Sequence, residues 1–258
     1  MLRFVYIFVI SSFLLPLNVQ ADDFWSLKNI NATKQGIKNI SQTVHRCSVG
    51  LNGYFKNKPE HLVIITYGDR DSFVKGLVSE LGFSVQTAEY FRKSSAPRPI
   101  NGKMLVPPDQ LLENVCHEVV HYYLESTTNR DNLLKAKWFD EGTASYLAAI
   151  IVKPESIDEI IKYFKKTYGN NFIPLSKIET EHDWHQLHQN MESRNKAYLQ
   201  AMTQMKYFFD NYSVSQFNEI LSLMNTSTFN QAFKMITGLS SKKFYRNWIK
   251  WMSKTENI

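Results

Sequence analysis

The chain has 258 residues, of which 43% are hydrophobic and 14% aromatic, and its formal net charge at pH 7 is +6. This composition excludes a disordered chain and supplies enough apolar side chains for one domain of two lobes or for two small domains. The basic residues are scattered among acidic ones instead of forming a patch, so we expect no nucleic-acid partner.

The N-terminus has the pattern of a secretory signal. Arg3 is followed by an apolar run over residues 4–17, and Ala21 ends a segment that a signal peptidase can cleave. The run is shorter than the roughly 20 apolar residues of a membrane-spanning helix, and an uncleaved anchor is the alternative. We therefore expect residues 1–21 to be a signal peptide. The mature protein, residues 22–258, is then expected to be periplasmic or secreted, without stable membrane insertion.

Apolar spacing and turn residues predict both helices and short strands in the first half of the chain. A β-branched run before Gly68 is typical of a buried strand, and the prolines of residues 94–102 mark a loop. The predicted elements are, in chain order, a helix within 24–45, a strand over His61–Tyr67, a helix over Asp71–Leu81 that ends at Gly82, strands over Val85–Phe91 and Lys103–Val106, and a helix over Gln110–Ser126 that Asp109 can cap.

The second half of the chain predicts helices alone. Their expected positions are about 133–150, 155–168, 190–210, 215–223, 227–236 and 241–252. Segregation of strands and helices along a chain is typical of the α+β class. We therefore expect an N-terminal lobe with a small mixed sheet, about 22–130, and an all-helical C-terminal lobe, about 131–258.

The chain has two cysteines, Cys47 and Cys116. In an oxidising compartment such a pair permits one disulfide, and a free thiol packed in the core is the alternative. Neither cysteine belongs to a Cys-x-x-Cys unit, so the sequence does not support a cysteine zinc site or a thioredoxin-like redox role.

The segment from His117 to His121 fits the pattern H-E-x-x-H. On a helix, side chains four positions apart lie on one face, so both imidazoles can reach a single zinc ion at about 2.0–2.1 Å. Glu118 lies beside them and can act as a general base without ligating the metal. A solvated helix face with two histidines is the alternative.

A third metal ligand is expected from a second motif, which runs from Trp138 to Tyr146. Its Glu141 follows His121 by 20 positions, which leaves room for a turn and a second helix that returns to the first. Catalytic zinc sites commonly use three protein ligands and keep the fourth position for water. The alternative role for Glu141 is a carboxylate that interacts with a helix N-terminus.

Together, His-Glu-x-x-His and Trp-x-x-Glu-Gly-x-Ala-x-Tyr resemble the gluzincin clan of metallopeptidases, which includes thermolysin and several aminopeptidases. A weaker likeness to peptidase-MA-like proteins continues through residues 196–202, 207–212 and 229–239, followed by Phe244 and Trp248. The resemblance implies a zincin-like (thermolysin-like) fold, one zinc ion and a peptide or protein substrate. It also implies that Tyr198 donates to the oxyanion of the transition state, although a core or rim tyrosine is the alternative.

Three further polar residues lie close to these motifs in the sequence. Ser145 can orient a metal ligand by contacting it without touching the metal, a role for which thermolysin-like enzymes use an aspartate. The alternative is a small residue at a contact between helices. Asp140 is expected to be solvated. Glu125 is expected to be an ordinary exposed carboxylate, with a supporting role at the metal site as the alternative.

The histidines of the segment Glu181–His188 form a separate cluster. With spacings of three residues, His182, His185 and His188 could bind a second ion on a helix. A polar helix surface or flap is the more common reason for such a run.

The sequence favours an endopeptidase over an aminopeptidase. The Gly-x-Met-Glu-Asn motif, which the aminopeptidase branch uses to anchor a free amino terminus, is absent between Ser84 and Asp109. The strand Lys103–Val106 could instead pair with an extended peptide. The rival functions are a non-hydrolytic metal-binding module that recognises a peptide or cell-surface partner, and a purely structural exported protein. The oligomeric state is not predicted.

Overall fold

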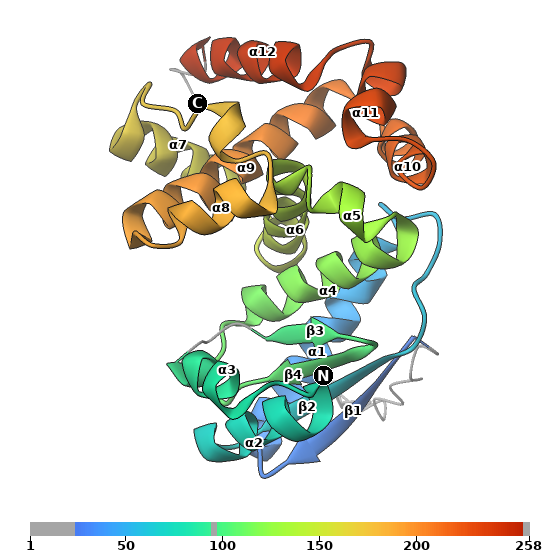
Figure 1. Ribbon diagram of the computed structural model, residues 1–258, viewed down its shortest axis with the longest axis vertical. Helices are drawn as coiled ribbons and strands as arrows, with labels where there is room; N and C mark the ends of the chain where they lie inside the picture. Colours follow the sequence, from blue (N-terminus) through green and yellow to red (C-terminus); the bar gives the residue numbers. More distant parts are fainter. Residues whose placement is uncertain (1–23, 94–96, 255–258) are drawn as a thin grey trace, which may run out of the picture.

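The computed structural model describes residues 24–93 and 97–254, and the predicted signal peptide lies outside the described residues. The fold is α+β, as predicted, with a small sheet and mostly helices. Figure 1 shows the sheet with α1 to α4 at one end of the molecule and α7 to α12 at the other. Among the described residues, no strand follows Val106.

The sheet has four strands in the order β1-β2-β4-β3. Three of them are parallel, and the short β3 pairs antiparallel with β4 at one edge. The predicted strands over His61–Tyr67 and Lys103–Val106 are confirmed. The bounds are β1 Trp25–Ile30, β2 Leu62–Tyr67, β3 Arg98–Ile100 and β4 Lys103–Val106.

Successive side chains of each strand point to opposite faces of the sheet, so the apolar residues of the strands contribute to two separate clusters. Ile65 and Leu105 pack on the face covered by α2, with Phe73 and Leu77. The opposite face belongs to the main core, together with α1 and α4. The helices of this half are α1 Lys34–Leu51, α2 Arg70–Leu81, α3 Val85–Tyr90 and α4 Leu112–Thr127.

Two predicted elements are wrong. The helix expected within 24–45 is strand β1 followed by α1, and Asn31 ends the strand in the left-handed region with φ of 60°. Parallel pairing with β2 outweighs the weak helical spacing of this segment. The strand expected over Val85–Phe91 is α3 followed by the 3-10 helix η1 (Phe91–Lys93), because the Ser84 side chain caps the helix by accepting from the Thr87 amide.

Two expectations about the segment before the zinc-binding motif also need correction. Asp109 does not cap α4, which begins after Leu111 without a side-chain cap, and instead forms an ion pair with Arg70. The strand Lys103–Val106 cannot add a peptide as expected, because β2 and β3 already pair with its two sides. The edge next to α4 is β3 (Figure 1).

The two cysteines form a disulfide that joins α1 to α4. The Cα atoms of Cys47 and Cys116 are 5.6 Å apart, and both side chains are fully buried. This decides between the disulfide and the free thiol, which the sequence left open. Because Cys116 directly precedes His117, the crosslink holds the helix segment that carries the first histidine of the motif.

The helices of the second half follow the predicted order. The helix predicted over 133–150 is α6, preceded by the short α5, and one helix, α8, lies where no helix was assigned. The bounds are α5 Arg130–Leu133, α6 Lys137–Val152, α7 Ser156–Tyr168, η2 Leu175–Lys177, α8 Glu181–Leu187, α9 Met191–Asn211, α10 Val214–Leu223, α11 Phe229–Thr237 and α12 Ser241–Lys254.

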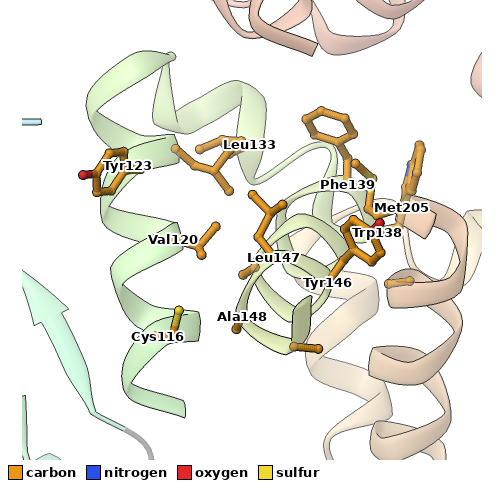
Figure 2. Packing of buried hydrophobic residues seen from close by; sticks show 14 of the residues in the cluster. Cys116, Val120, Tyr123, Leu133, Trp138, Phe139, Tyr146, Leu147, Ala148 and Met205 are labelled. Atoms are coloured by element: carbon orange, nitrogen blue, oxygen red, sulfur yellow. The ribbon is translucent and has the colours of Figure 1, made fainter. Parts of the chain in front are cut away.

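Helix α6 is the centre of the molecule, because it is buried along most of its length. Figure 2 shows Leu147 on α6 facing Val120 on α4. On the opposite side of α6, Phe139 lies near Met205 of α9. Gly142 permits the close approach of α6 to α9, since a Cβ atom at this position would lie 2.6 Å from the carbonyl oxygen of Ala201 on α9. The side chains of α4 and α6 are therefore brought into register by core packing.

Among the residues that the structure describes, no helix combines the length and apolar character needed to cross a membrane.

Candidate metal centre

The two histidines of the H-E-x-x-H segment lie on the face of α4 that points away from the sheet. The buried face carries Val115 and Val119, while His117 and His121 project together towards α6. Their ring centroids are 4.7 Å apart, and the two Nε2 atoms are 3.0 Å apart. One helical turn thus brings two imidazole nitrogens to a common point, as the spacing predicts.

Glu141 reaches the same point from α6. Its Oε2 atom is 3.2 Å from Nε2 of His117 and 3.4 Å from Nε2 of His121. The residue is 7% exposed, and its neighbours at Oε2 are the two ring nitrogens. The charge of this buried oxygen can therefore be balanced by a proton on an imidazole or by a cation held between the three atoms.

The three atoms fit one zinc ion. Ligands about 2.05 Å from a tetrahedral zinc ion lie about 3.3 Å from one another, and the three observed separations run from 3.0 to 3.4 Å. Two imidazole nitrogens and one carboxylate oxygen are also a common donor set of catalytic zinc. Within the described residues, His117, His121 and Glu141 form the single group of three that could hold an ion.

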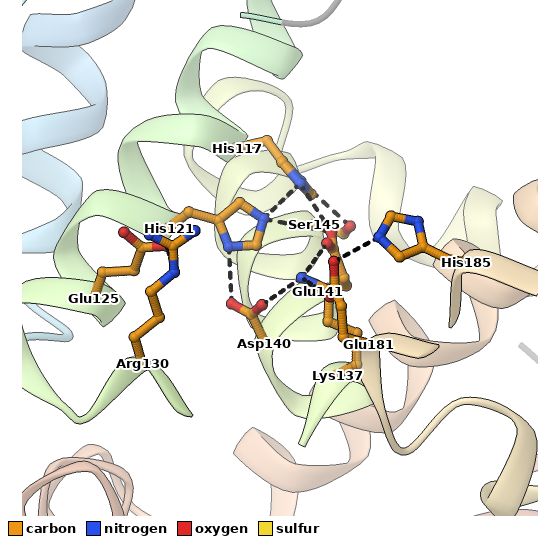
Figure 3. A network of polar contacts seen from close by, with 10 residues as sticks. All are labelled: His117, His121, Glu125, Arg130, Lys137, Asp140, Glu141, Ser145, Glu181 and His185. Atoms are coloured by element: carbon orange, nitrogen blue, oxygen red, sulfur yellow. Dashed lines mark hydrogen bonds and ion pairs between the residues drawn. The ribbon is translucent and has the colours of Figure 1, made fainter. Parts of the chain in front are cut away.

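Asp140 is not solvated, which corrects the expectation from the sequence. It is 4% exposed, and its Oδ1 atom lies 2.8 Å from Nδ1 of His121 (Figure 3). The packing of α6 against α4 turns this side chain inward. By accepting the Nδ1 proton, Asp140 holds the His121 ring in place, so that Nε2 faces the point it shares with His117 Nε2 and Glu141 Oε2.

Ser145 lies behind the other histidine. Its Oγ atom is 3.4 Å from Nδ1 of His117, and the residue is buried. This long contact is compatible with the orienting role that the sequence suggested, and it leaves Nε2 of His117 directed at Glu141. Glu125 is half-exposed beside Arg130, and burial raises the pKa of its carboxyl group above the usual value.

The charges of the site depend on one another. Burial opposes ionisation of Glu141, but Lys137 and His121 outweigh it and hold the pKa of Glu141 well below its usual value. Burial also opposes the charged form of His121, but Asp140 and Glu141 outweigh it and raise the pKa of His121 well above its usual value. The carboxylate is thus ionised, as a ligand must be, while a proton on His121 competes with a metal ion.

Lys137 is a member of the site that sequence reasoning missed. Its Nζ atom lies 2.8 Å from Oδ2 of Asp140, 2.9 Å from Oε1 of Glu141 and 3.3 Å from Oε2 of Glu181. The available signal was its position four residues before Glu141, which places both residues on one face of α6. Burial opposes the charge of Lys137, but the three carboxylates outweigh it and raise its pKa.

Tyr198 lies beside the metal-holding group, and Glu118 follows His117 directly in α4. Glu118 is half-buried and is not a member of that group. The ring of Tyr198, on α9, is 6.1 Å from the ring of His117. Burial, and then the charge of Glu141, raise the pKa of Tyr198 above its usual value, and Glu118 adds to the shift. The phenol therefore keeps its proton at neutral pH.

Among the described residues, no second metal group forms from His182 and His185 on α8 and His188 directly after it. His185 pairs with Glu181 at 2.9 Å, while the ring of His188 stacks on Tyr198 at 5.9 Å. Trp184, from the same helix, is buried against Tyr198 with ring centroids 5.2 Å apart. This segment therefore forms a wall of the site that supports Tyr198, a role that the sequence did not indicate.

A cavity of about 350 Å³ adjoins the metal-holding group. His117 and Ser145 form part of its lining, and Ala148, Ala149 and Met202 supply apolar surface. Glu113 and Lys153, which form an ion pair, also line it. The small side chains on this face of α6 leave the space that the cavity occupies.

A scan against protein-family models finds no match for this chain, and neither does a search of curated proteins.

Proposed function

We propose that this protein is an exported zinc-dependent peptidase of the gluzincin type, which hydrolyses peptide bonds in a peptide or protein substrate. The observation that carries the proposal is the convergence of His117 Nε2, His121 Nε2 and Glu141 Oε2 at separations suited to one zinc ion. The two motifs that resemble gluzincins contain these three residues and Glu118. A zincin-like fold is part of the same proposal.

His117, His121 and Glu141 would hold the zinc ion through one atom each. When bound, zinc supplies a Lewis acid that polarises the carbonyl group of the scissile amide and lowers the pKa of water. Asp140 keeps His121 in the required tautomer by accepting its Nδ1 proton. Burial of the three ligating side chains limits the access of bulk water to the reacting bond.

Glu118 is the proposed general base. It lies between the two histidines in the sequence of α4, within one helical turn of both, and is not a member of the metal-holding group. Its carboxylate takes a proton from the attacking water and passes it to the leaving amine. This requires an ionised carboxylate with access to solvent, and its half-buried position suits that role.

Tyr198 is the proposed oxyanion donor. Its phenol keeps its proton, because its pKa is raised by burial and by the charge of Glu141. Contacts with Trp184 and His188 restrict the ring to the side of the site next to His117. A hydrogen bond that forms as negative charge develops on the carbonyl oxygen stabilises the transition state more than the ground state.

The adjoining cavity gives a substrate side chain somewhere to bind. Its volume of about 350 Å³ and its partly apolar lining suit one residue next to the scissile bond.

The test compares metal content and peptide-library cleavage for the parent protein, Glu118→Gln and a control, Glu192→Gln, which alters an exposed carboxylate on α9. We expect stoichiometric zinc in all three. Hydrolysis should fall by roughly 10²–10⁴-fold in Glu118→Gln alone. Cleavage sites within the library peptides would support an endopeptidase.

Each other outcome rejects part of the proposal. Equal hydrolysis by Glu118→Gln and the parent would remove Glu118 from the mechanism. Zinc without turnover would favour a non-hydrolytic binding module, and protein purified without chelators that holds no zinc would refute the metal site.

A further inference from the structure

The contacts of Lys137 assign different roles to the two oxygens of Glu141. Oε1 lies 2.9 Å from the lysine Nζ atom, whereas Oε2 faces the two imidazole nitrogens at 3.2 and 3.4 Å. Figure 3 shows Lys137 on the side of Glu141 away from His117. Oε1 is therefore engaged by an ammonium group, and Oε2 is left for a cation.

We propose that Lys137 is a positioning residue that holds Glu141 as a one-oxygen ligand and so keeps one coordination position of the metal open. This inference rests on the proposed function, because it presupposes a metal ion between His117, His121 and Glu141. It goes further by assigning the openness of the site to a residue outside the metal-holding group.

The number of oxygens that Glu141 contributes decides whether the site can be catalytic. With one oxygen, the two histidines and Glu141 occupy three positions of a tetrahedral ion, and the fourth accepts water or a substrate carbonyl. With both oxygens, the protein would fill all four positions. A carboxylate can bind in either way, so something must select between them.

Lys137 can make this selection because it is buried and fixed. Its side chain is 12% exposed, so turning Oε1 towards the metal would weaken an ion pair that water cannot replace. The ammonium is also held by Asp140 at 2.8 Å, within α6, and by Glu181 at 3.3 Å, from α8. Two elements therefore determine where Nζ lies, and Nζ determines how Glu141 is turned.

Lys137→Met tests the inference, because methionine keeps an unbranched side chain and removes the ammonium. The full chain is loaded with Co²⁺, titrated with acetohydroxamate as a probe of the open position, and followed by visible absorption. We expect Lys137→Met to bind Co²⁺ and to weaken acetohydroxamate binding by roughly tenfold or more, a loss of the order that removing such a supporting partner causes in metal affinity or activity. X-ray absorption of the zinc form should show one additional oxygen neighbour.

Two further variants separate positioning from general stability. Lys137→Arg retains a cation that can contact Oε1, so it should restore most of the acetohydroxamate affinity. Lys135→Met, which alters an exposed lysine two residues earlier, should match the parent. If Lys137→Met does not fold, Lys137→Ala takes its place, because it removes the ammonium group and leaves no side-chain donor for Oε1.

The outcomes distinguish this inference from the proposed function. If the parent binds Co²⁺ and the probe, and Lys137→Met or Lys137→Ala does so equally well with an unchanged oxygen count, the role of Lys137 is overturned while the metal site stands. If the parent binds no metal ion, both proposals are overturned.

Discussion

The disulfide between Cys47 and Cys116 should contribute several kcal/mol to the stability of the fold. Replacing both residues by alanine removes a crosslink with a sequence separation of 69. The chain-entropy model assigns about 4 kcal/mol to a closed loop of that length. In a protein of this size, a loss of about 1 kcal/mol in the free energy of unfolding lowers the thermal midpoint by roughly 2–4 °C. The midpoint of the double variant should therefore fall by roughly 8–16 °C.

Urea unfolding of the double variant measures the effect and identifies its origin. If the crosslink restrains the unfolded chain, its removal should raise the m-value as well as lower the free energy of unfolding. Val44→Ala is the matched control, because it removes fully buried atoms from α1 without opening a crosslink, and it should leave the m-value unchanged. A double variant that unfolds at the same urea concentration as the parent would refute this reasoning.

Three other predictions concern the centre of the molecule. Asp140→Ala should weaken zinc binding by about 10–100-fold, and Asp140→Asn, which keeps an acceptor for Nδ1 of His121, should weaken it less. Chelator competition measures the zinc affinity of the parent and of both variants. Equal affinities of these three proteins would contradict the orienting role of Asp140. The pKa of His121 is raised in the metal-free protein, so protonation of His121 stabilises the metal-free fold at pH values below the unfolded pKa. This stabilisation is lost as the pH rises through the folded pKa, and zinc affinity should therefore increase with pH. Asp140→Asn removes a charge that raises the pKa of His121, so it should shift the increase in zinc affinity to lower pH. Gly142→Ala should lower the thermal midpoint, since its Cβ atom would lie 2.6 Å from the Ala201 carbonyl oxygen, and an unchanged midpoint would show that α9 can move away.

Sequence spacing was sufficient for the features that depend on one helix. The interval between His117 and His121 predicts a shared face of α4, and the structure has both rings on that face. The apolar stripe of α4 and the β-branched run of β2 likewise predict elements that form as expected. In each case the periodicity of the segment itself carries the information.

Local patterns failed where a partner from elsewhere decides the conformation. Residues 25–30 have only weak helical spacing, and they form β1 because β2 offers a parallel partner. Asp140 was expected in solvent, since its neighbours in the sequence do not reveal that α6 turns it towards His121. Burial on a helix that is covered on several sides cannot be deduced from a single amphipathic face.

The amino-acid sequence by itself determined the α+β class and the residues able to hold a metal ion. Only the tertiary structure decided that Cys47 pairs with Cys116, that Lys137 contacts three carboxylates, and that Glu141 presents one oxygen to the histidines. The physical reason is that the disulfide, the Lys137–Glu181 ion pair and the approach of Glu141 to the histidines join segments distant in sequence. No local periodicity encodes such contacts, and the last of them follows from the packing of α6 between α4 and α9.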